Sequence, residues 1–296
     1  MRRRAATCWT IRACIGVLLV LVGMGAAPAA QALDPRIVTL STVNGVLMAT
    51  FTDRVDDAAL QAAAPELIAR GVQAISLRGT PVHDISPLAG LTQLKTLDIC
   101  GSLVRSVGPL AGIAGLKSIN LQFLAIGDLS PLSGLTDLES LNLGGTEVRD
   151  LSPLARLTKL RDLVLAVTKV SDLSPLAGLR DMTSLDLGST SVGNIRPLAG
   201  MTAMRSLSLN GTPVDDVRAL RDMTELRALN LVGTQVRDIA PLARLSKLET
   251  LDLEGTPVDN VAPLAGMTAL RSLNLGGSRV KDISPLHEMR GLTIRR

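Results

Sequence analysis

One pattern of apolar and polar positions repeats along most of the chain. From Ile75 onward an isoleucine or leucine returns every 22 residues, and each is followed two residues later by a second aliphatic side chain. A constant period of this length is typical of a solenoid, in which each repeat buries its apolar side only by stacking on its neighbours. The pattern predicts ten repeats over residues 75–296, starting at Ile75, Leu97, Ile119, Leu141, Leu163, Leu185, Leu207, Leu229, Leu251 and Leu273.

Each repeat contains the same local signals. The Leu-x-Leu alternation predicts a short strand with its leucines inward, and a Gly-Thr pair predicts a turn after the strand. The run Asp-Ile-Ser-Pro-Leu then predicts a brief 3₁₀ or α turn on the outer side, with serine as its N-cap. We expect these turns to begin at Pro87, Pro131, Pro153, Pro175 and Pro285.

A hydroxyl follows the turn glycine in most repeats. Backbone groups inside a stack of turns need hydrogen-bond partners, so we expect these hydroxyls to bond to the turn of the adjacent repeat. The column comprises Thr146, Thr168, Thr190, Thr212, Thr234 and Thr256, with Ser102 and Ser278.

Residues 84–94, Asp-Ile-Ser-Pro-Leu-Ala-Gly-Leu-Thr-Gln-Leu, resemble the 22-residue repeats of the internalin-like bacterial leucine-rich repeat proteins. The resemblance implies an α/β fold, a right-handed superhelix of strands and short helical turns with parallel strands on the concave face. Two features differ from the family: threonine or serine replaces its asparagine ladder, and no immunoglobulin-like cap or wall-sorting motif follows the last repeat. The family's surface-anchored, host-receptor role is therefore not carried over to this chain.

Residues 1–32 have the three regions of a secretory signal peptide. Arg2, Arg3 and Arg4 precede the apolar run 15–24, and Ala30-Gln31-Ala32 provides a cleavage site. We expect an exported protein, periplasmic or secreted; the alternative is an uncleaved leader that anchors the chain in the membrane. Four of the 31 basic residues lie in this segment, which leaves 27 against 27 acidic residues. The rest of the chain is neutral, so no nucleic-acid partner is predicted.

Residues 33–74 predict an N-terminal cap of different structure. The segments 36–43 and 46–51 predict two strands around Asn44-Gly45, a strong hairpin signal, and residues 57–70 predict a helix that starts after Asp56. We expect the cap to cover the N-terminal end of the sheet. After Leu292 too few residues remain for an eleventh repeat, so either Arg295 and Arg296 protect an exposed edge by charge or that edge pairs with another chain.

Side chains for catalysis or cofactor binding are scarce. The two histidines, His83 and His287, lie about nine repeats apart, and no Gly-rich phosphate loop occurs. A column of aspartates could suggest calcium, but each lies two residues before a predicted helical turn, where backbone N–H groups favour an acid. We therefore predict no metal, no cofactor and no enzymatic activity. The column is Asp84, Asp128, Asp150, Asp172, Asp216, Asp238 and Asp282.

The inner strand face is the candidate binding surface, because it presents variable side chains on a rigid scaffold. One column on it is polar and faintly acidic, beside a basic rim interrupted by Glu139 and Glu249. In the third repeat, Phe123-Leu124 replaces the usual Gly-Thr. These two residues could form an apolar anchor with Leu103 and Val167; alternatively, Leu124 folds inward and repacks the turn. The predicted face residues are Asp98, Asn120, Asn142, Asp186, Asn230 and Asp252.

These features predict an exported, non-enzymatic scaffold that binds a protein partner through its concave strand face. A second hypothesis is a structural component of the envelope or extracellular matrix, which would self-associate through the C-terminal edge of the sheet. Concentration-dependent assembly of the purified protein would distinguish the two.

Overall fold

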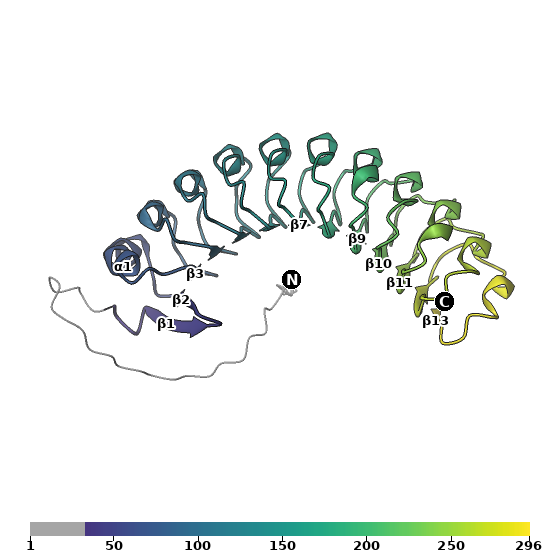
Figure 1. Ribbon diagram of the computed structural model, residues 1–296, viewed down its shortest axis with the longest axis horizontal. Coiled ribbons are helices and arrows are strands. Elements are labelled where there is room, and N and C mark those ends of the chain that lie inside the picture. Colours follow the sequence, from purple (N-terminus) through teal and green to yellow (C-terminus); the bar gives the residue numbers. More distant parts are fainter. Residues whose placement is uncertain (1–32) are drawn as a thin grey trace, which may run out of the picture. The chain divides into compact units, whose positions relative to one another are not determined.

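The computed structural model describes residues 33–296; the predicted signal peptide, residues 1–32, lies outside the described residues. Residues 33–296 form one sheet of thirteen strands arranged in sequence order. Only β1 and β2 pair antiparallel, and every later pair is parallel. The strands line the inner side of a curved stack and the short helices line its outer side (Figure 1). The predicted leucine-rich repeat solenoid is confirmed.

The N-terminal segment forms the predicted hairpin and helix. Strands β1 (Val38–Val43) and β2 (Val46–Phe51) are joined at Asn44 and Gly45, both with positive φ, and α1 spans Asp57–Ala69. Asp56 caps α1 by accepting the Ala59 N–H at 2.8 Å. Strand β2 pairs in parallel with the first repeat strand, so the hairpin covers the N-terminal edge of the repeat strands by extending the sheet by two strands.

The repeat strands are three residues long and keep the 22-residue register. In each, the central aliphatic residue is buried and its two neighbours face the inner side. Parallel pairing places Leu97 beside Ile75 and Ile119, and the same holds along the stack. The strands are β3 Ala74–Ser76, β4 Thr96–Asp98, β5 Ser118–Asn120, β6 Ser140–Asn142, β7 Asp162–Val164, β8 Ser184–Asp186, β9 Ser206–Ser208, β10 Ala228–Asn230, β11 Thr250–Asp252 and β12 Ser272–Asn274.

The outer side is a row of ten 3₁₀ helices. They are η1 Ser86–Gly90, η2 Gly108–Gly112, η3 Ser130–Leu132, η4 Ser152–Leu154, η5 Ser174–Leu176, η6 Arg196–Gly200, η7 Arg218–Leu220, η8 Ala240–Arg244, η9 Ala262–Leu264 and η10 Ser284–Leu286.

The expected start of these helices was wrong by one residue. Serine is the first helical residue and proline the second, and no side chain of the preceding N-cap residue caps the helix. The cap comes from one residue further back: Asp84 Oδ1 accepts the Ser86 N–H at 2.8 Å. The serine backbone N–H therefore donates the capping hydrogen bond, and the side chain of the column aspartate accepts it. The position of the aspartates before the turn suggested this role.

The threonine column also bonds differently from the prediction. Most of its hydroxyls donate to the carbonyl three residues earlier in their own repeat, as Thr212 does to Leu209 at 2.6 Å, and not to the adjacent repeat. The reason is geometric: the turn points that carbonyl inward, toward the hydroxyl that follows it. The same bond is made by Thr80, Ser102, Thr146, Thr168, Thr190, Thr234 and Thr256. Ser278 is the exception, since its hydroxyl accepts the Val280 N–H at 3.5 Å.

The C-terminal residues add one more strand, although too few remain for an eleventh repeat. Strand β13, Thr293–Arg295, pairs in parallel with β12 and places Ile294 beside Leu273, one residue short of the usual period. The apolar interior runs from β1 to this strand, but near β13 its members Ile283, Met289 and Leu292 are only partly buried. Within residues 33–296 no helix is long and apolar enough to cross a membrane.

Candidate functional site

The inner face contains the polar column that the sequence predicted. Each of its acidic and amide side chains forms a hydrogen bond with the backbone. In each, Oδ1 accepts the backbone N–H of the residue two positions later, at N···O distances of 2.9 to 3.2 Å. This bond is made by Asp98, Asn120, Asn142, Asp186, Asn230 and Asp252.

The second repeat shows why this bond is needed. The N–H groups of Ile99 and Gly101 donate to the next repeat, to the carbonyls of Asn120 and Gln122. The intervening N–H of Cys100 points away from that repeat and donates to Asp98 Oδ1 at 3.0 Å. Burial raises the pKa of Asp98, and the Cys100 N–H works against that rise. One oxygen of each column residue is thus committed to the fold, and Asp98 also forms a side-chain hydrogen bond with Asn120.

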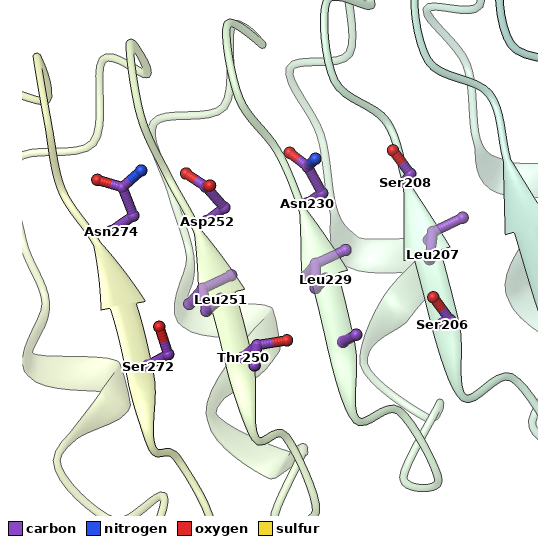
Figure 2. Close-up of a pocket in the computed structure, with 11 residues that line it drawn as sticks. Ser206, Leu207, Ser208, Leu229, Asn230, Thr250, Leu251, Asp252, Ser272 and Asn274 are labelled. Atoms are coloured by element: carbon purple, nitrogen blue, oxygen red, sulfur yellow. The ribbon is translucent and has the colours of Figure 1, made fainter. Parts of the chain in front are cut away.

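A shallow groove crosses the inner face over β9 to β12 (Figure 2). Its volume is about 370 Å³. Small side chains such as Ser206, Ala228 and Thr250 lie along one side, and Asn230 and Asp252 lie along the other. The groove is open and polar, so it suits an extended segment of a macromolecule better than an enclosed small molecule.

Charge on the inner face divides into two stripes. The side chains on and just after strands β3 to β12 include one cation, Arg78, against five carboxylates: Asp98, Asp162, Asp186, Asp252 and Glu254. The rim beside them is less basic than the sequence suggested, because Glu139 and Glu249 pair with the preceding repeats. Lys117 Nζ lies 2.8 Å from Glu139, and Arg227 pairs with Glu249.

Four rim cations are left without an ion pair within residues 33–296: Lys95, Arg161, Arg205 and Arg271. They lie one residue before strands β4, β7, β9 and β12. The face therefore presents carboxylates along its middle and unpaired cations along one border.

Three apolar side chains on the turns that follow the strands are exposed, and the term apolar patch denotes them. They are Leu103, Phe123 and Val167, which are 49 %, 45 % and 62 % exposed. Leu124, the other predicted member, is 1 % exposed and packs into the core. The inward alternative thus describes Leu124, and the patch does not include it.

Two patch residues adopt a backbone conformation that favours glycine. Phe123 has φ 63° and Val167 has φ 59°, at the position where neighbouring repeats have Gly145 or Gly211. The Phe123 ring lies over Gly145, where an added Cβ would come within 2.5 Å of Phe Cδ1. The strain at Val167 was not predicted, although the sequence shows valine where the turn glycine is expected.

His83 and Asp84 have structural contacts with the start of α1. Asp57 Oδ1, at the start of α1, accepts the N–H groups of His83 and Asp84 at 2.7 and 3.0 Å, which links the cap to the first repeat. His83 Nδ1 lies 3.7 Å from the same carboxylate. In the part of the chain that the structure describes, no group of three or more His, Cys, Asp or Glu side chains could hold a metal ion.

No family model and no curated protein sequence matches the chain. Solved structures do match. An internalin (inlF) from Listeria monocytogenes aligns over 84 % of this chain and 86 % of its own, at 24 % identity and a TM-score of 0.62. An internalin C2 from the same organism aligns over 71 % and 83 %, at 29 % identity and a TM-score of 0.50.

A plant structure is similar as well. It is the leucine-rich repeat ectodomain of the membrane receptor kinase GASSHO1/SCHENGEN3 from Arabidopsis thaliana, in complex with CASPARIAN STRIP INTEGRITY FACTOR 2. It covers 78 % of this chain and 29 % of that one, at 18 % identity and a TM-score of 0.62. The fold therefore defines the chain as a leucine-rich repeat protein. Within that class it is internalin-like, as the two Listeria structures show.

Proposed function

We propose that the chain is an exported, non-enzymatic scaffold that binds a protein partner through its concave strand face. A leucine-rich repeat ectodomain of similar fold has been solved with its bound factor, which supports a protein-interaction role in general. The choice of face rests on physical grounds: the inner strands present side chains in fixed columns on a rigid surface. Export rests on the signal-peptide pattern of residues 1–32.

The observation that carries this proposal is the strain at Phe123 and Val167. A non-glycine residue in the left-handed region costs on the order of 1 kcal/mol, and more for a β-branched side chain. Both side chains also leave much of their apolar surface exposed to water, 45 % for Phe123 and 62 % for Val167, so each is only partly used in packing. A contact surface for another molecule explains both costs, because strained and exposed apolar residues gather where ligands bind.

The charge pattern indicates how such a partner is oriented. Cationic side chains of the partner would lie over Asp186 and Asp252, and acidic side chains would approach Arg161 and Arg205. Complementary charge of this kind sets orientation and association rate more than affinity, so the apolar patch supplies the main anchor.

The test compares capture of a partner by the original protein and by Phe123→Gly. Crosslinking and pull-down from the exported fraction of producing cells identify the partner, and titration then measures affinity. We expect affinity to fall about tenfold or more, as for loss of an aromatic anchor. The free energy of unfolding should stay within about 1 kcal/mol, because relief of strain offsets the freedom that glycine gains in the unfolded chain.

Ile68→Ser is the matched control, since Ile68 is also an exposed apolar residue but lies on α1, on the outer side. It should leave affinity unchanged. Equal binding by the original protein and Phe123→Gly would refute the anchor role, and binding lost only with stability would assign Phe123 to folding.

A further inference from the structure

The N-terminal edge of the sheet is unprotected against pairing. Within residues 33–296, β1 has a neighbouring strand on one side only. Its sequence, Val-Thr-Leu-Ser-Thr-Val, has no charge, proline or bulge, and no charged residue occurs between Arg36 and Asp53. Edge strands are ordinarily blunted by such features. Strand β13 at the opposite edge does carry a charge, Arg295.

The hairpin register shows which backbone groups point outward. Val38 lies opposite Phe51, and the Thr52 N–H donates to the Ile37 carbonyl at 2.9 Å. In an antiparallel pair, hydrogen-bonded residues alternate along the strand, so Thr39, Ser41 and Val43 bond to β2. The C=O groups of Val38, Leu40 and Thr42 and the N–H groups of Leu40 and Thr42 therefore face the open edge, whereas the Val38 N–H donates to the Asp34 carbonyl at 3.0 Å.

From this geometry we infer that β1 pairs antiparallel with β1 of a second copy of the chain. The outward residues are spaced two apart about Leu40. A two-fold axis at Leu40 therefore matches the Leu40 N–H with the Leu40 carbonyl of the second copy, and the Thr42 N–H with its Val38 carbonyl. Leu40 then lies opposite Leu40 of the second copy, and Val38 lies opposite Thr42. An identical strand is self-complementary in this register without any further residue.

Side chains favour the same occupant. Leu40 is only partly buried and packs against the apolar core together with Leu33, Ile37 and Leu47. In the proposed register the two Leu40 side chains meet on the core side of the joined sheet, where each completes the burial of the other. No like charges approach each other, because the hairpin has none. Self-association is thus assigned to the N-terminal edge, independently of the proposed function, which uses the face.

Sedimentation of the purified protein over a dilution series tests this inference, combined with amide hydrogen exchange. We expect a dimer that dissociates on dilution. The amides of Leu40 and Thr42 should exchange slowly in the dimer and quickly in the monomer. The amides of Thr39, Ser41 and Val43 should be protected in both.

Thr42→Pro removes one outward N–H from an exposed position and should give a monomer at concentrations where the original protein is dimeric. If proline disturbs the hairpin, Thr42→Lys serves the same purpose by placing a charge on the edge. Thr50→Lys is the control: it adds the same charge to exposed Thr50 of the inner strand β2 and should leave the dimer intact.

Three results would overturn the inference: a monomer at every concentration, a dimer unaffected by both Thr42 variants, or protection of the Leu40 and Thr42 amides that persists on dilution. The last would show that another segment of the same chain covers β1.

Discussion

At the scale of single residues, the repeat is organised by side chains that satisfy its own backbone. The hydroxyl of Thr80 and its N–H both donate to the Leu77 carbonyl, and Asp98 accepts the Cys100 N–H. A solenoid leaves these groups unpaired in every repeat, and a buried unpaired group is costly. The same polar residue types therefore recur from one repeat to the next because the fold needs them, and their recurrence alone does not indicate a binding site.

Thr212→Val measures the contribution of one such hydroxyl. Thr212 is buried, and valine keeps its shape while losing the bond to Leu209. We expect the free energy of unfolding to fall by about 1 kcal/mol in urea denaturation, the usual contribution of a buried hydrogen bond. Thr202→Val, at an exposed position, should change it by less than about 0.5 kcal/mol. No loss at Thr212 would mean that its N–H alone satisfies the carbonyl.

At the scale of elements, each 3₁₀ helix depends on a side-chain acceptor two residues before it. Aspartate fills this position in most repeats, and Asn194 and Asn260 fill it in two others, with the same bond to the N–H of Arg196 and Ala262. Bonds to Ser130, Ser152, Ser174 and Ser284 lower the pKa of the preceding aspartate in each case. Arg218 lowers the pKa of Asp216 to about 2 through its side chain and its N–H.

These shifts predict the pH range in which the helices lose support. The folded pKa lies below the ordinary value of 3.8, so the caps stabilise the fold at higher pH and lose that contribution as pH falls from about 4 toward 2. Replacing Asp128, Asp150, Asp172 and Asp282 with asparagine keeps the acceptor and removes the titration. Urea denaturation across this range should show a smaller loss of stability on acidification.

Asp53→Asn and Asp181→Asn form the control for this series, because neither side chain makes a hydrogen bond or ion pair within residues 33–296. They should leave the acid dependence unchanged. A quadruple variant as acid-sensitive as the original protein would show that other carboxylates govern unfolding.

The sequence predicted the elements more fully than their contacts. The recurring leucines set the strands and their register, and Asn44-Gly45 and Asp56 set the hairpin and helix. The predicted acceptor of the Thr212 hydroxyl and the predicted first residue of η1 were wrong. The acceptor lies three residues before Thr212 and the helix starts one residue earlier than predicted, and only backbone geometry decides these offsets. Phe123 could be identified from the sequence because it replaces the usual turn glycine. The outward-facing backbone groups of β1 could not, because they depend on the strand pairing and not on residue type.

At the scale of the whole molecule, adjacent repeats are joined by matching columns. Ion pairs 22 residues apart connect neighbours on the surface, including Lys159 with Asp137 and Lys247 with Glu225, both at 2.6 Å. Exposed pairs of this kind contribute little individually. Stability comes from the shared apolar interior, which is sealed in the middle of the stack and only partly buried around Leu292 and Ile294.

This gradient predicts that the cost of a core substitution depends on its place along the stack. Leu209→Ala, in the sealed interior, should destabilise by about 2 to 5 kcal/mol, and Leu292→Ala by less than half of that loss. Urea denaturation of both variants measures the difference, and faster amide exchange in β13 than in β9 should accompany it, because a solenoid opens from its less buried end. Leu231→Ala should match Leu209→Ala, since Leu231 is equally buried one repeat away. Equal losses at Leu209 and Leu292 would mean that stability is uniform along the stack and that the partly buried end is held by contacts other than packing.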